Sequence, residues 1–413
     1  MRFASLLEKN GMLSAPVFIV LFVFFIPISP TMKSIFFVLA MATIVITPFY
    51  NKRILQAYNT LWGRAVLLLL AYIAIATLWS SAPLSMQWMV VNKYSKLIYL
   101  PLLAVGFIQS KTRLWSMNAF LASIFLTCII SVLKSQNIIQ SFDPGQVFYN
   151  HIITGFMVAL GFYLSGLFAF KAKGWQRMIY FTLMMLTSYQ LLFINTGRTG
   201  YVVYCILAVL LLMQKLTFKR AVLAVVLFII GIAAVYQVST TMQLRVNDLI
   251  NEVKSLEKNN PNTSFGYRIQ FHNYSKSLLA KHPLTGIGTG GFKYSFSQDN
   301  PVPGWGTDLS DPHSQYWMTL SEQGIIGLVL LLGFLFSLLV TSFQLTETKP
   351  IIIGVLASFC AGSFSDTILC YSTAGYLLIV MSALCFGELI EKRVYKTIPE
   401  RELNLADGQI VTS

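Results

Sequence analysis

The sequence has little charge. Only 11% of its 413 residues are charged, whereas 55% are hydrophobic, and the mean hydropathy is +0.66. A soluble protein usually carries charge on about 25% of its residues. One large soluble core is therefore excluded, because too little polar sequence is present to enclose it. Long apolar runs recur along the chain instead, which is typical of a polytopic membrane protein.

Cysteine is also scarce, and the common metal and nucleotide motifs are absent. The five cysteines lie in or beside apolar runs without C-x-x-C spacing, which argues against disulfides and a thiolate metal site. No H-E-x-x-H, G-x-S-x-G or D-x-D motif occurs, and the missing D-x-D argues against a metal-dependent sugar transferase. "GIGTGG" at 286–291 fits G-x-G-x-x-G only formally, because no strand precedes it, and it predicts a flexible turn. We expect no cofactor and no metal.

Hydropathy predicts an all-α fold of about twelve transmembrane helices. Lys93 and Lys96 intrude near the start of the fourth span, and the eleventh is short. The expected spans lie near residues 12–30, 33–50, 63–79, 90–109, 115–133, 148–170, 175–194, 199–214, 219–237, 313–343, 350–366 and 371–390.

The distribution of lysine and arginine predicts the orientation. With the N-terminus in the cytoplasm, eighteen of the thirty basic residues fall on the cytoplasmic side and five in short outer connections. The other seven lie in the long outer loop, and long loops cross regardless of charge. The net charge of +14 is therefore a topology signal and an attraction to anionic membrane lipids. Nucleic-acid binding is not expected, since there is no basic folded domain.

The longest polar region is the outer loop. Apolar residues at helical spacing predict an amphipathic helix near 242–256, and a second helix is predicted to stop before Pro283. The expected organisation is nine transmembrane helices in 1–237, the periplasmic loop in 238–312, three transmembrane helices in 313–391 and a cytoplasmic tail in 392–413.

The tenth span has a strong start signal. Asp311 fits an N-cap and Pro312 the first helical position, which would place His313 in the first turn at the outer membrane surface. Ionisable groups at such a boundary often face a cavity and mark a substrate path. A single arginine or lysine there is equally well explained as an interfacial anchor, and His313 alone as a solvated or capping ring. The functional case rests on several groups meeting at one depth: Arg198, Arg268, His313, Asp366, Lys93 and Lys96.

Four motifs carry a resemblance to a known family. "DPHSQYWMTLSEQGIIGLVLLLGF", from Asp311, resembles the H-[NST]-x-[YW]-L-x-x-L-x-E-x-G-x-x-G-L pattern of the O-antigen ligase and polymerase superfamily, with Met318 where leucine is common. "KHPLTGIGTGGF" is similar to its H-P-L-x-G-x-G-x-x-x-F element, "NTGRTGY" to its [ST]-x-[GS]-R-[GT] element, and "SFGYRIQFHNYSKSLLAKHP" to its arginine-bearing loop helix. The N-terminal half matches only in hydropathy.

The resemblance to the ligase branch, known as WaaL-like, implies a GT-C-like glycosyltransferase. It would be a multi-pass protein of the bacterial inner membrane with its active site on the periplasmic side. The donor would be a glycan on undecaprenyl diphosphate, and the acceptor a sugar hydroxyl of lipid A-core. The motifs assign the catalytic residues to Arg198, Arg268, His313 and Asp366. Further candidates for substrate binding are Lys93, Lys96 and Tyr316.

These residue types also suit the chemistry on physical grounds. Arginine binds phosphate oxygens bidentately and stays ionised, so two arginines can stabilise a diphosphate leaving group in place of a metal. Neutral imidazole can take the acceptor's proton near pH 7, and nearby guanidinium charge would favour that neutral form. Attack opposite the leaving group would invert the anomeric carbon. Asp366 would orient His313 or hold an arginine, and the loop would act as a lid with glycine hinges.

Two rival functions remain open. A polymerase or a protein O-oligosaccharyltransferase of the same superfamily would share the donor and differ in the acceptor. A transporter of lipid-linked sugar would suit twelve spans, but its charges should lie near the bilayer midplane in broken helices. The charges in this sequence are expected at the outer edge instead.

Overall fold

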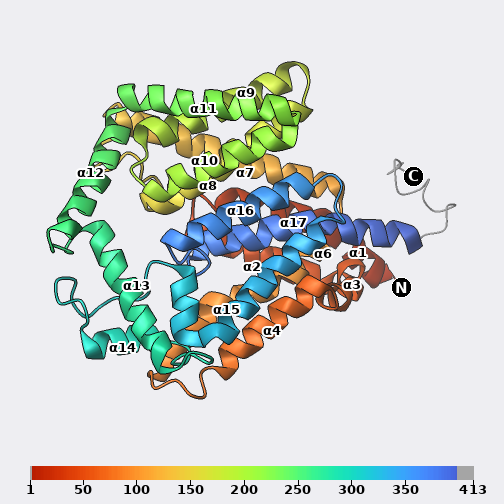
Figure 1. Ribbon diagram of the computed structural model, residues 1–413. Coiled ribbons are helices and arrows are strands. Elements are labelled where there is room, and N and C mark those ends of the chain that lie inside the picture. Colours follow the sequence, from red (N-terminus) through yellow and green to blue (C-terminus); the bar gives the residue numbers. More distant parts are fainter. Residues whose placement is uncertain (1, 398–413) are drawn as a thin grey trace.

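The computed structural model describes residues 2–397, and this part of the chain is helical, with no β-strand (Figure 1). Eight of its helices are long and apolar enough to cross a membrane, or nine if one bent pair counts as a span. The all-α, polytopic membrane class is thereby confirmed. The eight are α1 (Arg2–Phe25), α7 (Ser110–Ser135), α8 (His151–Lys171), α9 (Gly174–Tyr189) with η2 (Gln190–Ile194), α10 (Arg198–Lys215), α11 (Phe218–Val238), α15 (Gln315–Ser342) and α17 (Ser372–Thr397).

The remaining expected spans are helical but shorter or broken. Proline at the start of α3 (Pro48–Tyr58) ends α2 (Pro30–Ile46), and the two meet at a 95° bend. The span expected near 90–109 is divided into three pieces. This is why fewer helices than the expected twelve meet the length and composition of a full span. The pieces are α5 (Leu84–Ser95), η1 (Lys96–Ile98) and α6 (Tyr99–Gly106), and the two shorter apolar helices are α4 (Leu61–Ile75) and α16 (Lys349–Ser365).

The outer loop forms helices at one end of the molecule, at the left of Figure 1. They are α12 (Thr240–Glu257), α13 (Ser264–Lys281) and α14 (Gly291–Asp299). The first two match the helices expected from the sequence, whereas α14 was not expected. The start of α1 and the end of α17 lie at the opposite end (Figure 1). Since α17 continues to Thr397, the expected tail begins as helix, and its remainder lies outside the described residues.

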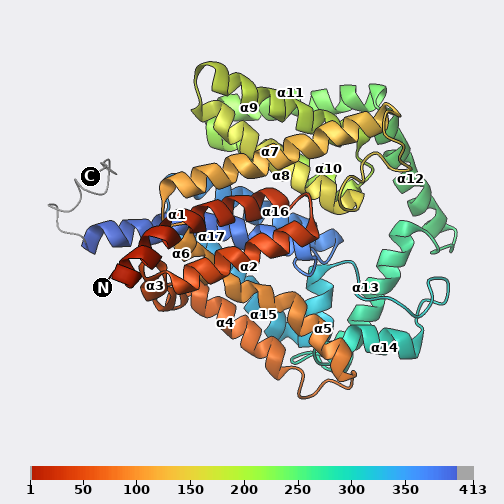
Figure 2. The ribbon, with the colours of Figure 1, turned by 180° about the vertical axis from the view of Figure 1, so that it is seen from behind.

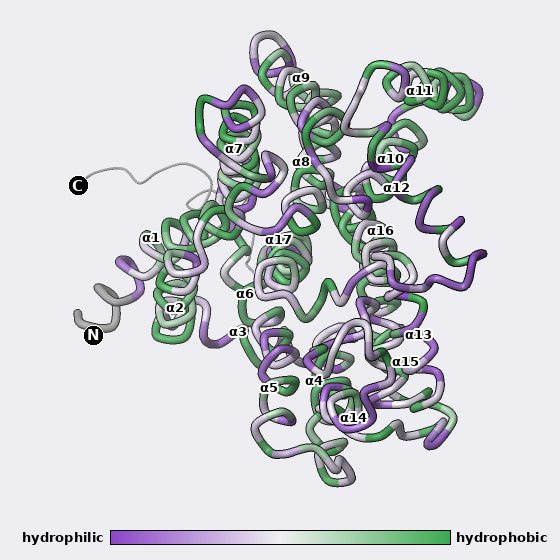
Figure 3. The backbone as a smooth tube through the Cα atoms, turned by 90° about the vertical axis from the view of Figure 1, so that its left-hand side faces the viewer, coloured by the Kyte–Doolittle hydropathy of each residue, from purple (hydrophilic) through white to green (hydrophobic). Residues whose placement is uncertain are grey.

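Burial separates a central pair of helices from the periphery. Nearly all of α8 and α17 is buried, whereas almost none of α11, which lies along one side of the bundle, is buried. On the reverse side α1 and α2 pack together (Figure 2). Hydropathic colouring marks the bundle helices as apolar and α12, with the segment after it, as polar (Figure 3). An apolar, exposed helix such as α11 is stable only in a lipid environment.

The glycine-rich segment packs into a break in α15. Gly324 has φ 66° and ψ −163°, which interrupts the helix. The freed backbone groups pair with the segment: Gly288 N–H donates to the Glu322 carbonyl (2.9 Å) and Ile325 N–H to the Pro283 carbonyl (2.9 Å). The turn expected of "GIGTGG" is present, with positive φ at Gly286, Gly288 and Gly290. Its tight packing argues against the expected glycine hinges, because a hinge needs free space.

Gly288→Ala is expected to destabilise the protein. A β-carbon there would lie 2.5 Å from the Ser80 α-carbon, and φ is +92°. The strained backbone alone costs about 1–3 kcal/mol. We expect a lower thermal unfolding midpoint in detergent for this variant. Gly333→Ala is the control, because a β-carbon at Gly333 meets nothing within 4 Å. An unchanged midpoint for Gly288→Ala would show that the segment yields easily.

Candidate active site

His313 lies just before α15 in a left-handed backbone conformation. The expected helix start at Asp311 and Pro312 is wrong, because α15 begins at Gln315 with Ser314 as its N-cap. Asp311 instead accepts a hydrogen bond from the His313 N–H at Oδ1 (3.1 Å), closing a short turn. His313 has φ 51°, which is uncommon for a residue other than glycine. Such strain persists where surrounding contacts enforce it, often at functional sites.

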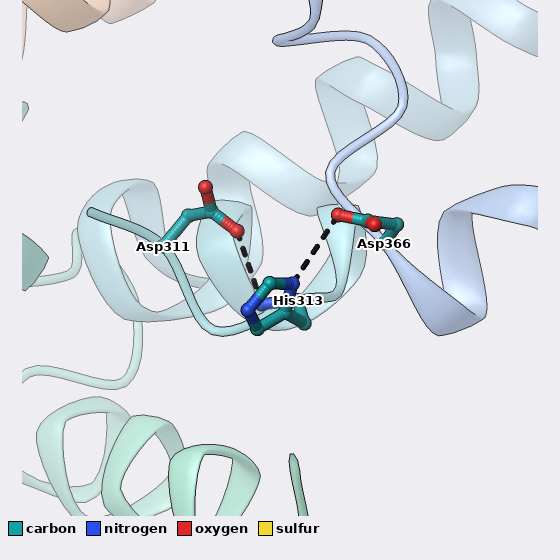
Figure 4. A group of neighbouring side chains, drawn as sticks. All are labelled: Asp311, His313 and Asp366. Carbon is teal, nitrogen blue, oxygen red and sulfur yellow. Dashed lines mark hydrogen bonds and ion pairs between the residues drawn. The ribbon is translucent and has the colours of Figure 1, made fainter. Parts of the chain in front are cut away.

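The His313 ring faces a buried carboxylate. Its Nδ1 lies 3.5 Å from Asp366 Oδ1, and the Asp366 side chain is fully buried (Figure 4). Asp366 ends α16 and is fixed by the Thr367 N–H (2.8 Å) and the Tyr371 hydroxyl (3.4 Å). Of the two roles considered for Asp366, the structure favours orienting the histidine. At 3.5 Å the contact is an ion pair when the imidazole is protonated, and it is too long to count as a hydrogen bond.

The acidic neighbours control the protonation of His313. Burial lowers the pKa of His313, but the contact with charged Asp366 and the charge of Asp311 raise it more. Arg268 acts in the opposite direction and is outweighed, so the net effect is a raised pKa. Guanidinium charge therefore favours the neutral imidazole, as expected, but the two carboxylates outweigh it. The carboxylates stabilise the imidazolium that a general base becomes after taking a proton.

Asp366→Asn is expected to move the acid limb of the pH profile of kcat/KM to lower pH. A carboxylate raises the His313 pKa, so its removal lowers the pKa and keeps the base neutral at lower pH. The measurement is kcat/KM as a function of pH for the transfer activity that the variant retains, even if that activity is low. Asp308→Asn is the control, because Asp308 is exposed and pairs with Lys293. An unchanged acid limb would mean that a group other than His313 titrates there.

Arg198 begins α10 directly after an irregular turn. The five-residue π-helix η2 ends at Ile194, and the Gly197 N–H donates to Asn195 Oδ1 (2.6 Å) to close the turn. The guanidinium of Arg198 donates two hydrogen bonds, of 2.7 Å each, to the Glu252 carboxylate of α12. This bidentate contact shows that the arginine is oriented to receive a two-oxygen anion.

Arg268 lies on α13 between Glu252 and His313. Its charge acts on both of these residues and on Tyr371. Phe271, three residues later on α13, places its ring 6.0 Å from the His313 ring. Within residues 2–397 the Arg268 guanidinium has no hydrogen-bond or ion-pair partner, so it is available to an incoming anion.

One further contact joins the segment that carries Arg198 to the segment that carries Asp366. The Thr199 hydroxyl lies 2.9 Å from the Ser365 hydroxyl, so the residue after Arg198 touches the residue before Asp366. The structure therefore brings Arg198, Arg268, His313 and Asp366 to one end of the bundle, from elements far apart in the chain.

Comparison with protein families points to the part of the chain that carries most of these residues. Residues 181–332 match the family model described as O-antigen ligase.

This match, which covers less than half of the chain, supports membership of the O-antigen ligase superfamily. The matched region spans α9 to α15 and includes three of the four grouped residues, Arg198, Arg268 and His313, while Asp366 follows it. A search of curated proteins gives no match. The superfamily contains glycosyltransferase-like ligases and polymerases, and membership agrees with the resemblance of the four sequence motifs.

One of the candidate substrate-binding lysines contacts the turn that follows Asp366. Lys96 is buried, and its ammonium donates to the Tyr371 carbonyl (2.9 Å). Lys33, also buried, donates to the Ser372 hydroxyl (2.7 Å). Both lysines therefore support the turn that follows Asp366. Lys93 is half-buried on α5, and its predicted contact with substrate stays a prediction.

Tyr316 faces α16 in this structure. Its hydroxyl donates to the Cys360 carbonyl (3.0 Å), and its ring lies 4.7 Å from that of Phe364. These contacts fix the first turn of α15, and through it the backbone that carries His313. The predicted role in substrate binding therefore needs the tyrosine to act with its ring edge or after a rearrangement.

A second acid–histidine pair supports the Arg198 turn, and sequence reasoning missed it. Asp143 Oδ2 lies 3.0 Å from His151 Nδ1 and accepts from the Thr196 hydroxyl (3.0 Å). The hydrogen bond from His151 lowers the pKa of Asp143 despite partial burial. "DPG" at 143–145 indicates a turn, but nothing local indicates that this turn meets residue 196. Glu252 was missed for the same reason.

Asp311, His313 and Asp366 are also the residues that could hold a metal ion. Their potential ligand atoms lie within 4.8 Å of one another. However, both Oδ1 atoms already accept backbone N–H groups, and the positive charge of Arg268 acts on the histidine. A nearby cation opposes binding of a divalent ion. Within the described part of the chain the Nδ1 atom of His313 has no hydrogen-bond partner, so these three residues would be the ligands if a metal ion did bind.

Proposed function

We propose that the protein transfers an O-antigen glycan from undecaprenyl diphosphate to a sugar hydroxyl of lipid A-core. The observation that supports this most is the grouping of Arg198, Arg268 and the His313–Asp366 pair at one end of a membrane bundle. Two guanidinium groups suit the diphosphate, and the histidine suits removal of a hydroxyl proton. Membership of the O-antigen ligase superfamily supports the same donor class.

The geometry supports one direction of proton transfer in this proposal. Because Nδ1 of His313 faces Asp366, the Nδ1–H tautomer is favoured and Nε2 is left to accept the acceptor's proton. The acceptor oxygen then attacks the anomeric carbon while the C1–O bond to the diphosphate breaks. Arg198 and Arg268 stabilise the charge that grows on the departing diphosphate. Single displacement from the opposite face inverts the anomeric carbon.

The two ends of the bundle differ in a way that supports a periplasmic site. At the far end Arg113 pairs with Glu391 (2.5 Å) and Lys392 with Glu388 (2.7 Å). The basic residues assigned to the cytoplasm by the positive-inside rule cluster there. The histidine site lies at the other end, beside the long loop. We therefore place the site on the periplasmic side of the inner membrane, where it can open sideways to lipid substrates.

The acceptor distinguishes this proposal from its nearest rival. A polymerase or a protein O-oligosaccharyltransferase would use the same donor site. The decisive test incubates purified protein with undecaprenyl-diphosphate-linked glycan and lipid A-core, and separates the products on a gel. A ladder of glycan on lipid A-core supports ligation. Growth of the lipid-linked glycan without lipid A-core would instead establish a polymerase. A transporter is disfavoured because these charges lie at one end of the bundle.

Transfer is expected to be insensitive to metal removal. The leaving group is stabilised by arginine in this proposal, so no divalent ion takes part in the step. Activity should be unchanged, within about twofold, by EDTA treatment followed by desalting. Loss of activity with EDTA and recovery with Mg²⁺ would contradict the arginine mechanism and would point to Asp311, His313 and Asp366 as ligands.

A further inference from the structure

Glu252 presents to Arg198 the same pattern of oxygens that a phosphate would present. Both Arg198 terminal nitrogens donate to it, each over 2.7 Å, in a parallel fork. Both side chains are partly buried, with 28% of Arg198 and 16% of Glu252 exposed. Guanidinium groups bind carboxylates and phosphates with the same geometry. One anion therefore excludes the other at this position.

Glu252 also lies within the influence of the second arginine. Its Oε2 accepts the Phe265 N–H (3.2 Å) in the first turn of α13, the helix that carries Arg268. The hydrogen bond from Arg198 lowers the pKa of Glu252 most, and the charge of Arg268 lowers it further. The carboxylate is therefore ionised at neutral pH, and it lies between the two groups that would bind the diphosphate.

The helix that carries Glu252 is weakly attached elsewhere. No residue of α12 is buried. Its first turn is tied to η2, where Ser239 and Thr241 donate to backbone carbonyls over 2.6 and 2.8 Å. Beyond that turn, Glu252 supplies the polar contacts that join α12 to α10 and α13. Segments with few buried contacts open at low free energy.

We propose that Glu252 is a built-in competitor that occupies the diphosphate position at Arg198 until the donor displaces it. Displacement releases the C-terminal half of α12 from α10, which couples donor binding to opening of this segment. This inference rests on the proposed use of Arg198 for the diphosphate. The exchange is favourable because a diphosphate carries more negative charge than one carboxylate. Before the donor binds, Glu252 pairs with the positive charge of Arg198 and holds its side chain in place.

Glu252→Gln tests the competition directly. The glutamine keeps the size of the side chain and removes its charge, so the variant should bind undecaprenyl diphosphate in neutral-lipid nanodiscs about 3- to 10-fold more tightly than the unaltered protein. Glu257→Gln, an exposed position on the same helix, is the control and should bind normally. Weaker binding by Glu252→Gln would mean that Glu252 orients Arg198 for the donor, and unchanged binding that it does not compete. Either result overturns the proposal.

Two further measurements keep the proposal testable. In the unaltered protein, amide hydrogen exchange over 246–257 should accelerate when undecaprenyl diphosphate is added, and unchanged or slower exchange would overturn the release of α12. Arg198→Ala separates this inference from the proposed function. If that variant binds undecaprenyl diphosphate normally, the proposed role of Arg198 fails. If its binding is weakened while Glu252→Gln binds no more tightly, only the inference about Glu252 fails.

Discussion

His313→Ala is expected to lower glycan transfer by about 10²- to 10⁴-fold, which is the usual contribution of a general base. The imidazole is the titratable group that faces both a fixed carboxylate and the arginine of α13. Alanine removes the proton acceptor and leaves the diphosphate contacts in place. Donor binding should therefore be retained while the turnover number falls.

The loss must be separated from a folding defect. His313 adopts φ 51°, a conformation that alanine also adopts at a cost, so the variant should be checked by thermal unfolding and by binding of undecaprenyl diphosphate. His282→Ala is a matched control, since His282 is exposed in the same outer segment. Normal transfer by a folded His313→Ala variant would exclude the histidine as the base. Loss of donor binding would assign it to the diphosphate instead.

Features governed by local sequence could be predicted. Apolar runs of span length located the helical segments, and the periodicity of 242–256 located α12, because both depend on side chains within one stretch. The grouping of Arg198, Arg268 and His313 was predicted through resemblance to a family. Hydropathy alone placed these residues near one membrane boundary and gave no information on their distances.

Features governed by distant backbone contacts could not be predicted. The polar residues 321–323 before Gly324 do not show that α15 breaks there. The helix breaks because residues 283–288, distant in the sequence, supply the hydrogen bonds that the break requires. The N-cap signal at Asp311 was equally local. It was overridden because His313 turns back toward Asp366, fifty-three residues later in the chain. Such competition between local and long-range contacts is expected at functional sites.

Arg198→Lys and Arg268→Lys are each expected to lower transfer by about 10²-fold or more, the usual cost of losing one donor to transition-state charge. Lysine keeps the charge but offers one compact ammonium in place of two parallel N–H groups. Arg198 already uses its fork on the two oxygens of Glu252, which shows that the backbone holds it in a bidentate orientation. Arg245→Lys is the control, because Arg245 pairs with exposed Asp248 on α12.

The losses in transfer activity from the two substitutions should also be less than multiplicative. If both arginines stabilise one diphosphate, the second loss acts on a leaving group that is already poorly held, so the double variant should lose less than the product of the single losses. Arg268 makes no ion pair in the described chain, so its substitution should leave thermal stability intact, whereas Arg198→Lys also weakens the contact with Glu252. Full multiplicativity with normal turnover numbers would place the arginines on different substrates. That result would mean that the two arginines contact donor and acceptor separately and do not share one diphosphate.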